Sequence, residues 1–184
     1  MAGKQISALE RVAAHPEGRY DLGCLYIGVN DIRAPDWDLT EFTRAFHFAV
    51  SFLNARCDRV LTVTAPLDLG RPRAGPRVIE LNRTVERIAT EVGALVLDLS
   101  DFKARNLVMA DHVHPTAFGQ IAISERALSL LARDGLSVRV WPRSLIYYET
   151  TPWTRLRGDA TYAYRHAKVS ARGALLALGQ MRRG

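Results

Sequence analysis

Residues 21–31 read Asp-Leu-Gly-Cys-Leu-Tyr-Ile-Gly-Val-Asn-Asp, a short apolar run that ends in a polar, glycine-containing turn. A run of this length that stops at turn residues is typical of a buried strand, here over 21–27. Residues 59–64 and 94–99 repeat the pattern. Apolar residues at helical spacing predict helices over 39–55, 78–92 and 115–133. This alternation predicts an α/β fold, a parallel sheet with helices on its faces.

The composition is that of one soluble domain. The chain has 184 residues, of which 48% are hydrophobic and 24% charged, so it can bury a core without a metal or a disulfide. Its apolar runs are too short to span a bilayer, and the start of the chain lacks the pattern of a signal peptide. Cys24 and Cys57 have no metal-type spacing, and we expect two buried free thiols in a reducing compartment. These features predict a cytoplasmic protein.

The positive charge is concentrated at the C-terminal end. Residues 138–184 carry nine Lys/Arg and two Asp/Glu, a net +7, whereas residues 1–137 sum to −1. We therefore divide the chain into a domain over 1–137 and a basic, aromatic-rich extension over 138–184, with Asp159 as a possible helix cap. The extension could be a strap that packs back on the domain, or a surface for an anionic membrane or an acidic partner. No motif supports a specific nucleic-acid partner.

Two short clusters carry chemistry. Gly28-Val29-Asn30-Asp31 follows the first predicted strand, and Asp111-His112-Val113-His114-Pro115 follows the third. Carboxyl ends of parallel strands meet at one edge of a sheet, so we expect both clusters there. Taken alone, the first cluster could be a plain turn, and the second a polar loop in which Asp111 and Pro115 start a helix. A metal at His112 and His114 would need a third ligand, and none stands at a telling spacing.

Together the clusters resemble the SGNH (GDSL-type) serine ester hydrolases. The third sequence block of that family is Gly-x-Asn-Asp after a strand, matched by Gly28–Asp31. Its last block is Asp-x-x-His-Pro before a helix with a downstream glycine, matched by Asp111, His114, Pro115 and Gly119. The resemblance covers about residues 1–133. It implies a flavodoxin-like three-layer α/β/α sandwich, hydrolysis of a small-molecule carboxylic ester, and no cofactor.

The resemblance also implies roles for these residues. His114 would be the general base, and Asp111 would orient its imidazole. The Asn30 amide would donate to the oxyanion, with Gly28 shaping its loop. Gly3, in a segment similar to the family's second block, is a candidate backbone donor. His112 competes with His114 for the role of base, but the spacing to Asp111 and Pro115 favours His114.

The nucleophile is the missing part. The family begins with a strand that ends in Gly-Asp-Ser, and no serine of this sequence has that context. The family's strands 1 and 2 would then precede Met1, which leaves residues 21–27 as an edge strand. One explanation is a natural start upstream of Met1. The alternative is a non-catalytic binding or interaction protein that keeps the SGNH fold.

Overall fold

The computed structural model describes residues 19–146 and 151–181, and it describes side chains as far as Leu175. The chain forms two compact units. The first extends to Ala65 and includes Pro76–Ser100, and the second combines Pro66–Gly75 with the chain from Asp101 onward. The predicted boundary near residue 137 stays a prediction.

The first unit is built on a parallel sheet of three strands in the order β1-β2-β3. The strands are β1 (Gly23–Leu25), β2 (Val60–Val63) and β3 (Leu95–Leu97). Gly23 pairs with Val60, and Leu61 pairs with Leu95. All four residues of the central strand β2 are buried. The α/β class, the parallel sheet and the neighbour relations of its strands are confirmed, although each strand is shorter than predicted.

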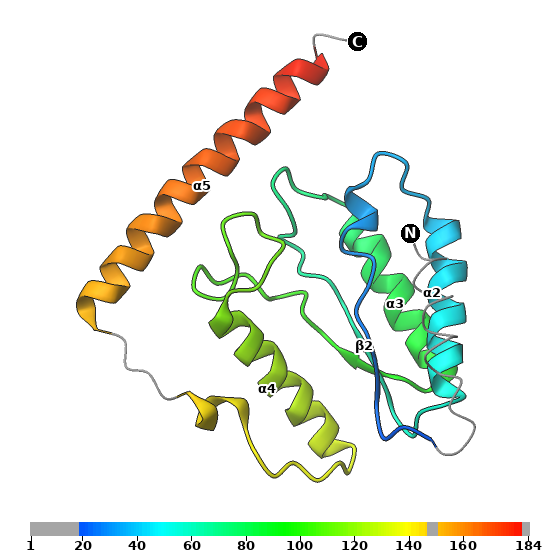
Figure 1. Cartoon of the computed structure of the whole chain (residues 1–184). Coiled ribbons are helices and arrows are strands. Elements are labelled where there is room, and N and C mark those ends of the chain that lie inside the picture. Colours follow the sequence, from blue (N-terminus) through cyan, green and yellow to red (C-terminus); the bar gives the residue numbers. More distant parts are fainter. Residues whose placement is uncertain (1–18, 147–150, 182–184) are drawn as a thin grey trace. The chain divides into compact units, whose positions relative to one another are not determined.

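Two helices pack against each other and against this sheet (Figure 1). They are α2 (Leu39–Asn54) and α3 (Arg77–Val92), and Gly93 is the C-cap of α3. Asp38 caps α2, because its carboxylate accepts hydrogen bonds from the backbone N–H groups of Thr40 and Glu41. The core between the helices and the sheet includes Phe46, Val50, Leu61, Leu81, Val85 and Ile88.

Buried polar side chains fix the carboxyl ends of β2 and β3. The Asn82 side chain accepts a hydrogen bond from Ala65 N and donates one to Ala65 O, both at 2.8 Å. Thr64 Oγ1 donates to Asp98 Oδ1 and accepts from Leu99 N. The backbone groups of Ala65 and Leu99 lie past the ends of the strands and away from water, so these side chains supply the hydrogen bonds that they would otherwise lack. The chain therefore leaves β2 and β3 in a fixed direction.

Strand β1 lies at the edge of the sheet, and among residues 19–146 and 151–181 no strand pairs with its outer side. The expectation of two buried thiols is wrong for Cys24, which is exposed on this edge strand, whereas Cys57 is buried. Burial raises the pKa of the Cys57 thiol. Gly23 faces α2, where a Cβ atom would lie 3.3 Å from Leu53 Cδ2, so the next residue, Cys24, faces the opposite side of the sheet.

The second unit contains α4 (Ala117–Arg133), a 3-10 turn η2 (Pro142–Leu145) and α5 (Pro152–Met181). Helix α4 begins two residues later than predicted, because Thr116 is its N-cap and accepts a hydrogen bond from Gly119 N. Turn η2 packs on α4, where Arg143 pairs with Glu125 at 2.9 Å.

Helix α5 differs from its predicted form at its start. It begins at Pro152, so Asp159 lies inside the helix and does not cap it. The Asp159 carboxylate pairs instead with Arg105 at 2.8 Å, which ties α5 to the loop before α4. None of the helices in the described part of the chain has the length and apolarity needed to cross a membrane.

Candidate active site

The loop before α4 holds a hydrogen-bonded carboxylate and imidazole. His114 Nδ1 lies 2.8 Å from Asp111 Oδ2. The imidazole side chain is 67% exposed and the carboxylate 37% exposed. A carboxylate on Nδ1 fixes the tautomer, so Nε2 keeps its lone pair. Among the residues that the structure describes, no hydrogen bond occupies His114 Nε2. This ring nitrogen can therefore accept a proton from a hydroxyl group.

Backbone N–H groups hold the Asp111 carboxylate in place. Oδ1 accepts hydrogen bonds from Val113 N at 2.9 Å and from His114 N at 3.1 Å. Partial burial alone would raise the pKa of Asp111, but the hydrogen bonds from the His114 side chain and from these two N–H groups outweigh it and hold that pKa below its usual range. Asp111 is therefore ionised at neutral pH and can stabilise an imidazolium at His114.

The loop returns on itself and leads directly into α4. Met109 N donates to His114 O, and Thr116 N donates to Leu107 O. A Cβ atom at Gly119 would lie 1.9 Å from the Leu107 carbonyl oxygen. Only glycine allows α4 to approach the loop this closely, which explains why the motif has a glycine at this position.

His112 lies two residues away in a different environment. Its side chain is 11% exposed, and Nδ1 lies 2.8 Å from Asp68 Oδ2. Nε2 lies 3.0 Å from Arg71 Nη2. Arginine can only donate, so the neutral tautomer with its proton on Nδ1 satisfies both partners. Burial, followed by the positive charges of Arg71 and Arg73, holds the pKa of His112 below its usual range.

His112 also shapes the backbone of the loop. It has a φ of 56°, in the left-handed region that residues other than glycine rarely adopt. Gly70 N donates to His112 O at 2.8 Å. The side chain and the backbone of His112 thus both hold the 66–75 loop against the loop of Asp111 and His114. The two histidines are chemically distinct: both ring nitrogens of His112 have partners, whereas His114 keeps one available.

Asn30 follows β1 in a tight turn. Gly28 has a φ of 99°, and a Cβ atom there would lie 2.6 Å from Leu81 Cδ1. Ile32 N donates to Gly28 O, and Ile32 is buried. Arg77 donates to the carbonyl oxygens of Ile32 and Ala34, which anchors the turn to α3. Asn30 itself is exposed, so its amide can donate to a group outside the unit.

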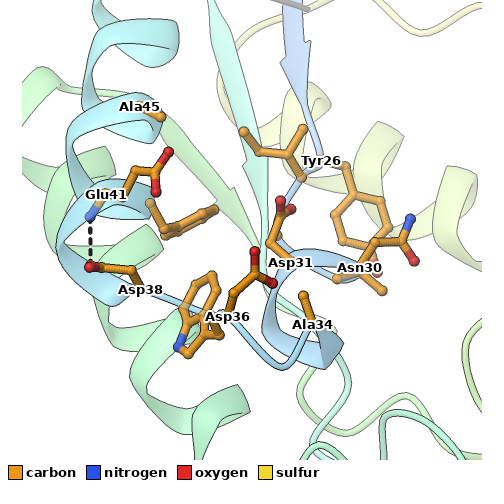
Figure 2. A pocket seen from close by; sticks show the side chains of 13 residues that line it. Tyr26, Asn30, Asp31, Ala34, Asp36, Asp38, Glu41 and Ala45 are labelled. Atoms are coloured by element: carbon orange, nitrogen blue, oxygen red, sulfur yellow. Dashed lines mark hydrogen bonds between the residues drawn. The ribbon is translucent and has the colours of Figure 1, made fainter. Parts of the chain in front are cut away.

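A cavity of about 300 Å³ lies beside this turn. Figure 2 shows the carboxylates of Asp31 and Asp36 between the turn and the start of α2, with the Asn30 amide on the other side of the turn in this view. The predicted strand end and turn, residues 26–31, form part of this lining, and the sequence assigned no role in a site to the lining residues from Ala34 onward. The acidic residues that follow the first strand, at positions 31, 36, 38 and 41, were the sequence feature that could have indicated this cavity. The lining residues are Tyr26, Ile27, Gly28, Val29, Asn30, Asp31, Ala34, Asp36, Trp37, Asp38, Glu41, Phe42 and Ala45.

The structure brings together only part of the predicted site. Asp111 and His114 form a pair, and Gly28 and Asn30 share one turn. These two groups belong to different units, so their meeting at one sheet edge stays a prediction. Gly3 lies outside the described residues. In the described part of the chain, no group of three or more His, Cys, Asp or Glu is arranged to hold a metal ion.

Comparison with known proteins found its matches among solved structures. No protein-family model matches the chain, and no curated protein matches it. A member of the lipolytic G-D-S-L family from Veillonella parvula DSM 2008 matches with a TM-score of 0.59 and 20% identity, over 72% of this chain and 75% of that one.

Two further structures resemble the chain. An acetylxylan esterase from Geobacillus stearothermophilus matches with a TM-score of 0.59 and 18% identity, over 76% of this chain and 71% of that one. An alpha/beta hydrolase from the Lake Arreo metagenome matches with a TM-score of 0.57 and 15% identity, over 71% of this chain. The chain spans only 66% of the length of that hydrolase. At such identities these similarities establish the α/β hydrolase-like fold.

Proposed function

We propose that this chain is the main part of an SGNH-type serine hydrolase that cleaves small-molecule carboxylic esters. The observation that carries the proposal is the Asp111–His114 pair, at 2.8 Å, with an exposed imidazole. The likeness to a G-D-S-L family protein and to an acetylxylan esterase supports it. Another solved form of that esterase is a catalytic mutant in which a serine is replaced by alanine.

The proposed reaction transfers an acyl group through a serine. His114 Nε2 takes the proton of the serine hydroxyl as its oxygen bonds to the ester carbonyl carbon, and Asp111 stabilises the resulting imidazolium. The Asn30 amide donates to the developing oxyanion, together with a backbone N–H for which Gly3 is the candidate. His114 returns the proton to the departing alcohol. Water, deprotonated by His114, then releases the acid and restores the serine.

We propose that the nucleophile comes from a segment outside the given sequence. The free edge of β1 supports this, because a parallel strand added there would end near the turn of Gly28 and Asn30. In a family strand of that kind the terminal residues are Gly-Asp-Ser.

The test compares the chain as given with a form extended by the codons upstream of Met1. On a short p-nitrophenyl ester we expect negligible turnover from the given chain, because loss of a nucleophile costs about a millionfold. The extended chain should turn over at about one per second or faster. Turnover of that size by the given chain, abolished by His114→Ala, would place the nucleophile inside it. A stop codon upstream, or a folded but inactive extended chain, would favour the non-catalytic binding protein.

A further inference from the structure

We propose that the outward face of α5 binds an anionic lipid surface. The proposal rests on how the two faces of this helix differ. One face contacts the rest of its unit, and the other carries large apolar side chains and a row of cations in solvent.

The inward face of α5 is defined by its contacts. Arg105 pairs with Asp159 and lies over the Tyr162 ring, with 5.9 Å from its guanidinium carbon to the ring centre. The His166 ring centre is 6.3 Å from that of His112. Together with the half-buried Val169 and Gly173, these residues recur every three or four positions, so they form one stripe along the helix.

The opposite face exposes bulky apolar side chains. Trp153, Tyr164 and Leu175 are 71%, 68% and 69% exposed. They are spaced eleven residues apart, which is about three helical turns, so they lie nearly in line over a length of about 33 Å. Ala160 and Ala171 lie on the same line, and their small side chains add no polar group to it. A line of large apolar side chains along an exposed helix face can contact a membrane or another partner along its whole length.

Cations follow one side of this apolar line. Arg157, Lys168 and Arg172 are exposed and lie roughly 20–80° around the helix from it. The 30 residues of α5 contain five Lys/Arg and one Asp, a net charge of +4. Side chains of Lys and Arg beside Trp, Tyr and Leu match the boundary of a bilayer, where anionic headgroups border acyl chains.

The shape of this face separates lipid from other anionic partners. The cations are spread along the helix and do not converge on a pocket, which suits a continuous negative surface better than one acidic side chain. A nucleic acid would engage the cations through its phosphates and leave Trp153, Tyr164 and Leu175 in water. A lipid interface takes up both parts of the face at once.

The test is co-sedimentation of the full chain with vesicles. We expect binding to vesicles made of phosphatidylcholine and phosphatidylglycerol in equal parts, weak binding to pure phosphatidylcholine, and release by salt. Lys168→Gln with Arg172→Gln should lower the vesicle affinity about tenfold or more, since each cation contributes to attraction near the surface. Lys103→Gln with Arg139→Gln removes the same charge from exposed positions outside α5 and should have little effect.

A second pair of variants tests the apolar line. Tyr164→Gln with Leu175→Gln should weaken binding, whereas Val140→Gln with Leu145→Gln, at exposed apolar positions outside α5, should leave it unchanged. Glutamine is a good helix former, and circular dichroism checks that α5 persists. Equal effects of the α5 variants and their controls would overturn the proposal. So would equal binding to neutral vesicles, or tighter binding to a DNA duplex than to anionic vesicles.

Discussion

Asp68 and His112 form a pair, at 2.8 Å, between the 66–75 loop and the loop that carries Asp111 and His114. Arg73 also pairs with Asp68, and Arg71 donates to the far ring nitrogen of His112. This arrangement requires a neutral His112, and it explains why His112 is unsuited to act as a base despite its place beside His114. Its function here is to hold the loop.

The first prediction concerns the charge of His112. Burial and the two arginines lower its pKa, so it should titrate below the ordinary value of about 6.5. When the folded-state pKa of a histidine is depressed, its contribution to the free energy of unfolding is complete above the unfolded-state pKa. This contribution is lost as the pH falls from the unfolded-state pKa to the folded-state pKa. Nuclear magnetic resonance of the ring protons measures this titration. Arg71→Gln should raise the pKa of His112, and Arg139→Gln should not. A pKa at or above 6.5 in the parent chain would contradict the neutral pair.

The second prediction concerns Asp111 and acid. Its folded-state pKa is depressed, so its contribution to stability is complete above the unfolded value of about 3.9 and is lost as the pH falls through the folded-state pKa. Urea unfolding of the parent chain and of Asp111→Asn should therefore differ at about pH 5, where the carboxylate is ionised in both the folded and the unfolded chain. The difference should shrink below about pH 4. A difference that is unchanged down to pH 2 would show that the carboxylate has no preferred partner.

The third prediction tests the polar clamp at the end of β2. Asn82→Ala leaves the buried N–H and C=O groups of Ala65 without partners, so it should lower the free energy of unfolding by about 2–4 kcal/mol. Asn54→Ala is the matched control, since Asn54 also donates to a backbone carbonyl, that of Val92, but at an exposed site. Its loss should be about 1 kcal/mol or less. If urea denaturation gave the same loss of unfolding free energy for Asn82→Ala and Asn54→Ala, burial would not strengthen the contribution of the Asn82 hydrogen bonds.

The fourth prediction separates chemistry from structure at Asn30. In an active extended chain, Asn30→Ala should lower kcat about a hundredfold or more with little change in KM, because an oxyanion donor acts on the transition state. The melting temperature should change little, since Asn30 is exposed and its side chain caps no helix. A destabilised variant whose folded fraction turns over normally would make Asn30 a structural residue of the turn.

The local features were predictable from sequence because they depend on neighbours along the chain. Apolar spacing predicted α2 and α3, and the spacing of Asp111 and His114 matched a hydrogen bond within one loop. The pairing of Asp68 with His112 joins positions 44 residues apart, and no periodicity encodes it. The exposure of Cys24 was missed because an apolar run does not reveal which face of an edge strand is covered.

The starts of α4 and α5 also depend on particular hydrogen-bond partners that the sequence pattern did not identify. The start of α4 was placed at Pro115 by its fixed φ, but the hydroxyl of Thr116 bonds to Gly119 N and sets the start at Ala117. Asp159 was expected to cap α5, yet its ion pair with Arg105 uses the carboxylate elsewhere. Helix α5 begins earlier in the chain, where Thr151 Oγ1 accepts a hydrogen bond from Thr154 N.

We propose that His114, and not His112, is the base of an ester hydrolase. The decisive measurement is the turnover number of the extended chain on a short p-nitrophenyl ester, with His114→Ala and His112→Ala compared side by side. We expect a loss of about 10⁴-fold or more for His114→Ala, since it removes the proton acceptor. His112→Ala should lower the turnover number by no more than about a hundredfold, because it would displace the loop of His114 without removing the proton acceptor. Equal losses, or a larger loss for His112→Ala, would show that His114 is not the base.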